Sequence, residues 1–398
     1  MPFVLPNKIN VVDLQQIIVH MQHQYEIPTL PLQYDLETKA VLKQLAKAHR
    51  ALAELKGLAV TIPNENILIS SLTLQEARDS SSIENIITTQ DDLYKADLDI
   101  KNYTIAPAAK EVRYYREAIF LGFSQVRQRH LITNNTIIKI QNCLKRTIGG
   151  FRSTPGTTLK RDDGIIIYEP PQDPQDVIAY MSNLEKFIND SELSDLDPLI
   201  KMAIIHHQFE SIHPFSDGNG RTGRIINILY LVNNNLLDLP ILYLSRYITH
   251  NKSEYYRLLQ TVRDNEDKEK EWERWILFML NGIEETANET IRLVKEISRL
   301  MAEYKQILKP IFGPRYKHEL LNNLFFHPYT KIEFVCNDMS VQRKTAAKYL
   351  EMIVETGLLE KVKIGRENFY VNIKLYKLFL NCTSEYNDDT FNIVTENH

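Results

Sequence analysis

Several groups that bind phosphate lie close together in residues 213–224, which read His-Pro-Phe-Ser-Asp-Gly-Asn-Gly-Arg-Thr-Gly-Arg. The small residues at positions 218–220 allow successive backbone N–H groups to point at one anion. If a helix begins there, its N-terminal dipole adds positive potential. Arg221 and Arg224 are three residues apart, so both guanidinium groups can face one phosphate from the first helical turn. The spacing therefore predicts an anion-binding loop.

Two further side chains of this stretch supply metal and acid–base chemistry. Asp217 stands directly before the glycines, where a carboxylate can share Mg²⁺ with phosphate oxygens. His213 stands at the entrance of the loop, and an imidazole can move a proton near neutral pH. Together with the loop, these residues predict metal-assisted phosphoryl or nucleotidyl transfer. The stretch has no lysine and does not match Gly-x-x-x-x-Gly-Lys-Ser/Thr, so it is not a Walker A loop.

Each part has a plainer interpretation when it is taken alone. A Gly-Asn-Gly sequence is commonly only a turn, and two arginines three residues apart commonly lie on a solvated helix face. Their concentration in twelve residues favours the phosphate site. Apolar runs at 198–211 and 225–233 predict the two helices that hold the loop. The first helix also carries His206 and His207, which we expect in the core because no metal-ligand spacing accompanies them.

The stretch resembles the Fic motif, His-x-Phe-x-Asp/Glu-Gly-Asn-Gly-Arg-x-x-Arg, with every defining position present. Most Fic proteins transfer AMP from ATP to a hydroxyl side chain of a target protein. The resemblance implies that His213 deprotonates the target hydroxyl, that Asp217 holds Mg²⁺, and that Arg224 binds the γ-phosphate. It implies an ATP- and phosphate-binding set made up of Gly218, Asn219, Gly220, Arg221, Thr222, Gly223 and Arg224.

A second motif lies at residues 80–86, Ser-Ser-Ser-Ile-Glu-Asn-Ile. From the residues alone, it indicates a helix boundary with capping serines. It also resembles the Fic inhibitory motif, Ser/Thr-x-x-x-Glu-Gly/Asn, at Ser80, Glu84 and Asn85. The resemblance implies that Glu84 reaches Arg224 and takes the place of the γ-phosphate. The α-phosphate of ATP would then be misplaced for in-line attack, so we expect autoinhibition within one chain.

The sequence predicts a β-hairpin at residues 157–168, because β-branched runs flank Asp162-Asp163-Gly164. Alone it is a surface hairpin. In the Fic family a hairpin in this place, the flap, aligns the target by strand addition. The resemblance implies flap contacts from Lys160, Arg161, Ile165, Ile166 and Tyr168. It also places an adenine pocket near Asn251, Tyr255 and Tyr256, although aromatic rings on a helical face are usually core.

Residues 315–375 predict a helix-turn-helix followed by a hairpin, which resembles a winged helix. We expect its main helix at 340–356, with Ser340 as the N-cap. Basic side chains that could contact phosphates lie on this helix and on the wing, namely Arg343, Lys344, Lys348, Lys361, Lys363 and Arg366. Glutamates at 351, 355, 360 and 367 alternate with them. We therefore favour partner or target recognition, or dimer support, over DNA binding.

The composition places the chain in a broad class. At 398 residues it can form two or three domains, and 43% hydrophobic and 25% charged residues are ordinary for a globular protein. A net charge of -4 gives no hint of wholesale nucleic-acid or membrane binding. The three cysteines, Cys143, Cys336 and Cys382, are far apart and fit a reducing compartment. With no signal peptide or membrane span in the sequence, we expect a cytoplasmic protein.

The expected fold is mainly α, with a Fic (Fido) helical core, a β-hairpin flap and a C-terminal winged-helix-like domain. The expected parts are an N-terminal helical region at 1–106 with the inhibitory motif at 80–85, a catalytic core at 107–282, a linking helix at 283–314, the winged-helix-like domain at 315–375 and a loose tail at 376–398.

The leading functional hypothesis is an autoinhibited protein adenylyltransferase that uses ATP and Mg²⁺ and modifies target proteins and, as an open option, itself. Removal of AMP by the same site is a second hypothesis, in which Glu84 orients water. A DNA-binding regulator with a nucleotide-sensing core is a third. A family variant that phosphorylates its targets has a lysine at the position of Gly220, which argues against that activity here. The target and the oligomeric state, including a homodimer, stay open.

Overall fold

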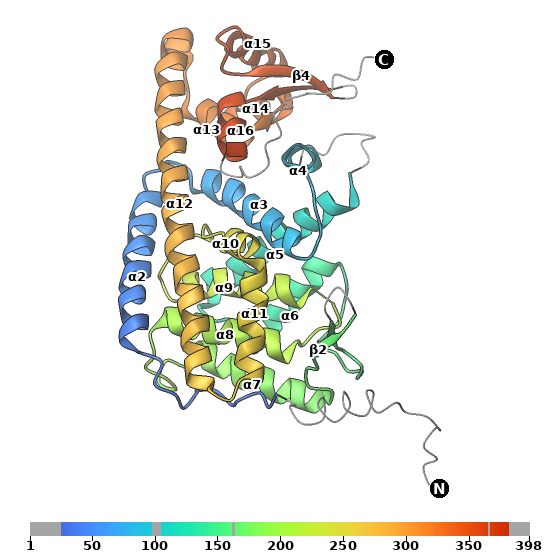
Figure 1. The fold of residues 1–398 in the computed structure, drawn as a ribbon. Coiled ribbons are helices and arrows are strands. Elements are labelled where there is room, and N and C mark those ends of the chain that lie inside the picture. The colour runs from blue at the N-terminus through green and yellow to red at the C-terminus, as the bar shows by residue number, and fades with distance from the viewer. Residues whose placement is uncertain (1–24, 98–104, 161–163, 365–366, 382–398) are drawn as a thin grey trace, which may run out of the picture.

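The protein is described here by a computed structural model, which covers residues 25–97, 105–160, 164–364 and 367–381 (Figure 1). The expected mainly α fold is confirmed. The N-terminal and central part consists of α2 (Lys39–Ala59), α3 (Glu65–Ile83), α4 (Gln90–Asp97), α5 (Pro107–Arg129), α6 (Asn134–Lys145), β1 (Leu159–Lys160), β2 (Ile166–Tyr168), α7 (Pro174–Asn189), α8 (Pro198–Ile212), α9 (Asn219–Asn233), α10 (Ser245–His250) and α11 (Lys252–Asp264).

Helices α8 and α9 form the centre of this part. Helix α8 begins at Pro198, after Asp197, whose side chain accepts a hydrogen bond from the backbone N–H of Leu199 at 2.8 Å. This is an ordinary N-cap, and proline suits the first helical turn. All residues of α8 after Pro198 are buried, because apolar or neutral side chains cover most of its circumference. Helix α8 is therefore held from every side and can present its C-terminal end rigidly.

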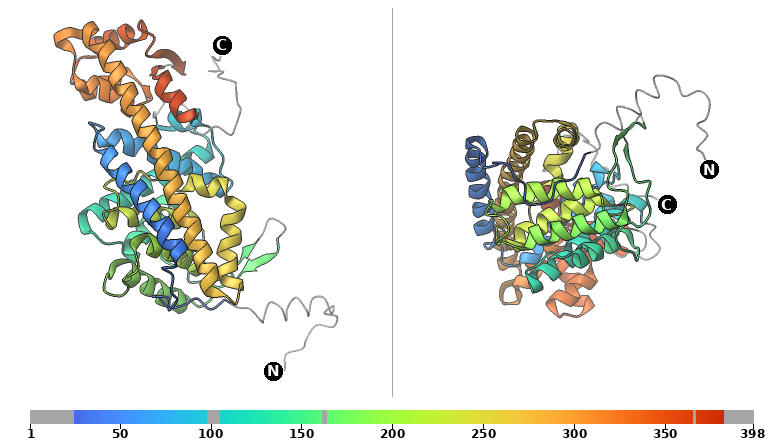
Figure 2. Two further views of the ribbon diagram at one scale, coloured as in Figure 1. Left: turned by 60° about the vertical axis from the view of Figure 1, so that its left-hand side comes forward. Right: turned by 90° about the horizontal axis from the view of Figure 1, so that it is seen from below.

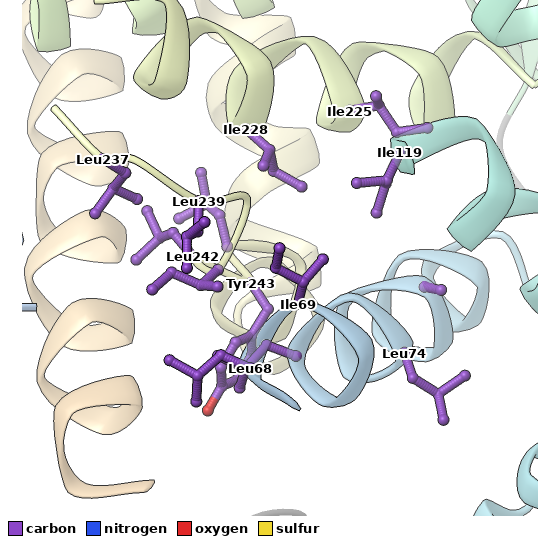
Figure 3. Close-up of a cluster of buried hydrophobic side chains, with 14 of the residues drawn as sticks. Leu68, Ile69, Leu74, Ile119, Ile225, Ile228, Leu237, Leu239, Leu242 and Tyr243 are labelled. Carbon is purple, nitrogen blue, oxygen red and sulfur yellow. The ribbon is translucent and has the colours of Figure 1, made fainter. Parts of the chain in front are cut away.

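Helix α3, which carries the inhibitory motif, packs into the same core. Figure 3 shows the apolar side chains of α3, α5 and α9 meeting those of the segment that follows α9. The side chains labelled there are Leu68, Ile69, Leu74, Ile119, Ile225, Ile228, Leu237, Leu239, Leu242 and Tyr243. Burying aliphatic side chains of this size stabilises the contact by roughly 1.5–3 kcal/mol each. Helix α3 is thus an integral part of the core.

Helix α12 (Lys268–Phe312) is a single helix of 45 residues. The prediction that a linking helix begins near residue 283 was wrong about this boundary. The charged segment at 268–273, the apolar segment after it and the predicted linking helix form one continuous helix, which Gly282 does not interrupt. A Cβ atom at Gly282 would lie 2.6 Å from Cδ1 of Tyr247, so this glycine serves close packing against α10. Helix α2 runs alongside α12 (Figure 2).

The C-terminal part consists of η1 (Gly313–Arg315), α13 (His318–Phe326), β3 (Tyr329–Thr330), α14 (Ile332–Met339), α15 (Arg343–Val354), β4 (Glu360–Ile364), β5 (Glu367–Val371) and α16 (Ile373–Asn381). The strands form an antiparallel sheet in the order β3-β5-β4. Two details of the prediction were wrong. Ser340 has φ 53° and ends α14 in a left-handed conformation, so α15 begins at Arg343. The tail predicted to be loose from residue 376 is helical through Asn381, because Phe379 is fully buried.

No helix in the described part of the chain is long and apolar enough to cross a membrane. The predicted positions Arg161, Arg366 and Cys382 lie outside the described residues.

Candidate active site

The motif loop, residues 213–220, joins the end of α8 to the beginning of α9. His213 ends α8 with φ 49°, and Gly218 precedes α9 with φ 125°. The side chain of Asn219 closes the loop, since its Oδ1 accepts from the N–H of Phe215 and its Nδ2 donates to the carbonyl of Phe215, both at 2.9 Å. A φ of 125° strongly favours glycine at position 218. The loop is therefore preformed and brings backbone N–H groups together at the N-terminus of α9.

Two other motif residues, Thr222 and Gly223, stabilise the position of the loop on α9. The hydroxyl of Thr222 donates to the carbonyl of Gly218 at 3.1 Å, and Thr222 is fully buried. A Cβ atom at Gly223 would lie 2.7 Å from Oε1 of Glu210 on α8. Gly223 therefore allows α9 to approach α8 closely. These contacts give both positions a structural reason beside the predicted role in phosphate binding.

His213 is held in the form that a general base needs. Burial, together with the positive charges of Arg263 and Arg152, lowers the pKa of His213 to about 4. The imidazole is therefore neutral at physiological pH and can accept a proton. The histidine is the C-cap of α8, so the buried helix sets its position.

Arg224 contacts two residues of the predicted inhibitory motif, Ser80 and Glu84. Its Nη2 lies 2.8 Å from Oε1 of Glu84 and 3.1 Å from the carbonyl of Ser80, and its Nε donates to Oγ of Ser80 at 2.8 Å. The arginine side chain is 2% exposed and that of Glu84 is 36% exposed. Partial burial would raise the pKa of Glu84, but the charge of Arg224 outweighs it, and the pKa lies below its usual value. The carboxylate is ionised and paired at neutral pH.

The turn after Glu84 is formed by Asn85, which has φ 60°. Asparagine tolerates this left-handed conformation better than most residues. Its Oδ1 accepts from Nζ of Lys252 at 3.3 Å. All three predicted inhibitory residues thus lie together beside α9, although 140 residues separate Glu84 from Arg224.

Two charged residues of the site were missed by the sequence analysis. Oε2 of Glu111 lies 2.7 Å from Nη1 of Arg221 and 3.9 Å from Nζ of Lys145. Nζ of Lys145 also lies 2.8 Å from Oδ2 of Asp217. The four side chains form a row of alternating charges beside the motif loop. Glu111 is on α5 and Lys145 is on α6, and no local pattern in either helix marks them as functional.

The residues present fit a Mg²⁺ ion at Asp217. The carboxylate is a hard oxygen ligand, 69% exposed, and a cationic group already lies within 2.8 Å of it. In the part of the chain that the structure describes, three or more His, Cys, Asp or Glu residues nowhere converge on a metal position. A Mg²⁺ ion here would therefore take its other ligands from substrate phosphates and water, as this ion commonly does.

Buried ionisable groups lie beneath the loop. Burial lowers the pKa of His206 to about 3, and its Nε2 lies 2.8 Å from the hydroxyl of Tyr255. His207 is also buried, with its Nε2 3.1 Å from the carbonyl of Leu259. Both histidines are therefore core residues, as expected. Burial raises the pKa of Glu210 to about 7, even though Arg224 acts in the opposite direction.

The predicted adenine contacts differ in their exposure. Tyr255 is 1% exposed and packs against Tyr256 and Trp275, whereas Tyr256 is 41% exposed. Nδ2 of Asn251 donates to the carbonyl of Tyr247 at 2.9 Å. Tyr256 is thus the more exposed of the two tyrosines.

The predicted hairpin is present as β1 and β2, which pair antiparallel with an irregularity between Leu159 and Lys160. Its predicted residues divide into two groups. Ile165, Ile166 and Lys160 are exposed, whereas Tyr168 is buried and donates its hydroxyl to the carbonyl of Ser211 at 2.8 Å. The guanidinium of Arg263 lies 4.0 Å from the centre of the Tyr168 ring. Tyr168 therefore fastens the flap to α8 and α11.

Three segments of the chain match known protein families. Residues 42–124 match the Fic/DOC family N-terminal model, and residues 131–231 match the Fic/DOC family model. Residues 300–375 match the model described as protein adenylyltransferase SoFic-like, C-terminal domain. The first match contains the inhibitory motif, and the second contains the motif loop.

Individual relatives show more limited similarity. Protein adenylyltransferase Fic of Drosophila erecta is 32% identical over 91 residues, which are 23% of this chain and 18% of the relative. The protein of the same name from Drosophila melanogaster gives the same values, 32% over 91 residues, 23% and 18%. The crystal structure of a Fic family protein from Desulfovibrio desulfuricans G20 has a TM-score of 0.53 at 18% identity and covers 86% of this chain and 98% of that one. This last similarity concerns the fold alone.

Proposed function

Because the chain belongs to the Fic/DOC family, we propose that it is a protein adenylyltransferase that transfers AMP from ATP to a serine, threonine or tyrosine hydroxyl of a target protein. The names of the Drosophila relatives and of the C-terminal family model support this activity. Within the site, a neutral, partly buried histidine beside an anion-binding loop supports it.

The chemistry follows from the residues of the loop. The imidazole of His213 accepts the proton of the target hydroxyl, and the hydroxyl oxygen forms a bond to the α-phosphorus. The bond between the α-phosphorus and its bridging oxygen breaks, and pyrophosphate leaves. Backbone N–H groups of the motif loop and the Arg221 guanidinium stabilise the charge on the phosphate oxygens. Asp217 would hold Mg²⁺ with those oxygens, and the ion would neutralise part of their charge.

We further propose that Glu84 inhibits this reaction. The observation that carries this is the ion pair of 2.8 Å between Glu84 and Arg224. A carboxylate on that guanidinium leaves it unable to bind the γ-phosphate. The triphosphate of ATP is then not held in line with an incoming hydroxyl, and small misplacements of reacting atoms cost orders of magnitude in rate.

Incorporation of labelled AMP from α-³²P-ATP with Mg²⁺ tests the proposal. The proteins compared are wild type, Glu84→Gly and the double variant Glu84→Gly/His213→Ala. We expect label on protein with Glu84→Gly, less with wild type and none with the double variant. Absence of label in all three, with ATP binding intact, would contradict the transferase.

Removal of AMP from a modified protein is a variation of the same proposal, since one site can serve both directions. In that reaction Glu84 orients the attacking water. Release of labelled AMP from a pre-modified target distinguishes the two. Loss of release in Glu84→Gly together with gain of transfer would assign both directions to this site.

A second candidate function is DNA binding by the C-terminal part. Arg343 and Lys344 are exposed in the first turn of α15 and Lys348 is exposed further along the helix, and in the described residues none of the three forms an ion pair. Helix α15 has no acidic residue in its first turn and no side-chain cap. Cations at a helix N-terminus are repelled by the positive end of the helix dipole. An anionic partner bound there would offset this repulsion. Binding of the full chain to a labelled duplex, with affinity falling steeply as salt rises, would support it.

A further inference from the structure

Arg152 is a buried arginine that contacts the motif loop and has no ion pair within the described residues. It is 7% exposed. Its Nε donates to the carbonyl of His213 at 2.9 Å, and its Nη2 donates to the carbonyls of Ile212, at 3.4 Å, and Pro171. Its backbone N–H donates to the carbonyl of Pro214 at 2.8 Å. Each of these acceptors is a backbone carbonyl, which is unusual for a buried guanidinium.

These acceptors belong to two functional segments. The carbonyls of Ile212 and His213 are at the C-terminal end of α8, where the helix dipole favours a positive charge. The carbonyl of Pro171 follows the last strand of the flap. Next to Arg152, the ring of Phe151 packs on Phe215 of the motif loop, with centroids 5.5 Å apart. One side chain thus joins the proton-accepting histidine to the base of the hairpin beside the site.

We propose that Arg152 is a positioning residue. It holds His213 in its left-handed conformation and fixes the position of the flap relative to that histidine. This inference rests on the proposed function. It goes beyond the motif, because Arg152 lies 61 residues before His213 and outside residues 213–224. Its guanidinium does two things that separate variants can distinguish: it forms the hydrogen bonds, and its charge helps to keep the imidazole neutral.

The test uses Arg152→Lys and Arg152→Met in the Glu84→Gly chain. Lysine keeps the charge but loses the fork of donors, whereas methionine loses both. We expect kcat to fall by about 10- to 100-fold in both variants, with KM for ATP nearly unchanged. Only Arg152→Met should also move the acidic limb of the pH–rate profile and the imidazole titration of His213, measured by NMR, to higher pH. Arg246→Met is the control, since its side chain is 15% exposed and contacts Glu289 on α12.

The outcomes separate the inference from the proposed function. If the Glu84→Gly parent transfers no AMP, the transferase proposal fails, but the NMR titration still tests the effect of Arg152 on His213. If Arg152→Lys retains the parental kcat, or both variants behave like Arg246→Met, the positioning role is refuted. Should Arg152→Met not fold, Arg152→Lys decides the matter through kcat.

A second and independent observation concerns the two helices on either side of Glu84. On α4, Oδ1 of Asp91 accepts from the hydroxyl of Tyr329 on β3 at 2.7 Å. The rings of Tyr94 and Tyr329 stack with centroids 5.6 Å apart, and Tyr376 of α16 packs against both. On α3, Ser71 and neighbouring residues face the α13–β3 turn across a cavity of about 100 Å³. The C-terminal part therefore contacts both arms of the inhibitory segment.

We infer that the C-terminal part holds the inhibitory segment against α9, so that loosening this contact activates the enzyme. Tyr329→Phe removes one hydroxyl and should raise AMP transfer about fivefold in the chain with Glu84 present. The same change in the Glu84→Gly chain should have no effect, because the inhibitory carboxylate is already absent. Tyr370→Phe is the control, since its hydroxyl also bonds a carboxylate, that of Glu351 at 2.8 Å, away from α4. Equal effects in both backgrounds, or none in the first, would refute the inference.

Discussion

Replacing Glu84 by glutamine removes the charge of the inhibitory motif while keeping its shape. The carboxylate lies 2.8 Å from a guanidinium that is only 2% exposed, but is itself 36% exposed. Truncating one partner of a buried, hydrogen-bonded charge pair costs about 2–5 kcal/mol. Solvent screens the exposed carboxylate, so we take the lower end, about 2 kcal/mol. Since 1.4 kcal/mol is a factor of ten, the contact holds Arg224 about 30-fold more strongly than glutamine would.

The assay is AMP incorporation at saturating ATP, with wild type, Glu84→Gln and Glu84→Gly measured side by side. We expect Glu84→Gln to transfer AMP about 30-fold faster than wild type, because Arg224 becomes available to the γ-phosphate. Thermal unfolding without nucleotide should show a loss of stability of about 2 kcal/mol, since a buried guanidinium loses its counter-charge. ATP should restore part of that loss by binding to the folded state.

The control is Glu54→Gln, which breaks the exposed ion pair with Lys295 at 3.0 Å. Exposed pairs contribute little, so its rate and stability should match wild type. The reasoning is refuted if Glu84→Gln transfers AMP at the wild-type rate while ATP still binds. It is also refuted if activity rises equally in Glu54→Gln.

Three further predictions concern single residues. Because burial and nearby arginines lower the pKa of His213 to about 4, the acidic limb of kcat/KM in Glu84→Gly should lie well below pH 6.5; a limb near 6.5 in the pH–rate profile would contradict this. Gly218→Ala should destabilise the protein by about 1–3 kcal/mol in denaturant unfolding and weaken ATP binding, because φ is 125° there; unchanged values would show that the loop adapts. Burial raises the pKa of Glu76 to about 7. The protonated Glu76 carboxyl therefore contributes to folding stability fully below about pH 4.5, and this contribution is lost as pH rises through 7. The stability of wild type relative to Glu76→Gln should fall over that range in thermal scans, and a constant difference would argue against the shift.

The sequence determined the parts of this protein whose physical causes lie within a few residues of each other. Three closely spaced glycines, two arginines at helical spacing and a histidine after an apolar helix specify the motif loop from neighbouring residues alone. The mainly α fold followed from apolar periodicity, and the hairpin from β-branched runs beside a glycine turn. Ser340 failed as a cap because the short turn between α14 and α15 required a left-handed residue there, which propensity does not reveal.

Only the tertiary structure decided what surrounds the motif loop. Glu111, Lys145 and Arg152 reach the loop from three other segments, and no local pattern sets them apart from ordinary surface or core residues. The sequence also does not show which of Tyr255 and Tyr256 is buried: they are adjacent, but Tyr255 is buried and Tyr256 is exposed. The contact between Glu84 and Arg224 could be anticipated by resemblance, whereas the burial of Arg224 and the contacts of α3 and α4 with the C-terminal part could not. Each of these features depends on how helices that are distant in the chain pack together. Apolar faces drive that packing, so the sequence around each charged residue does not show which other charged residue it will contact.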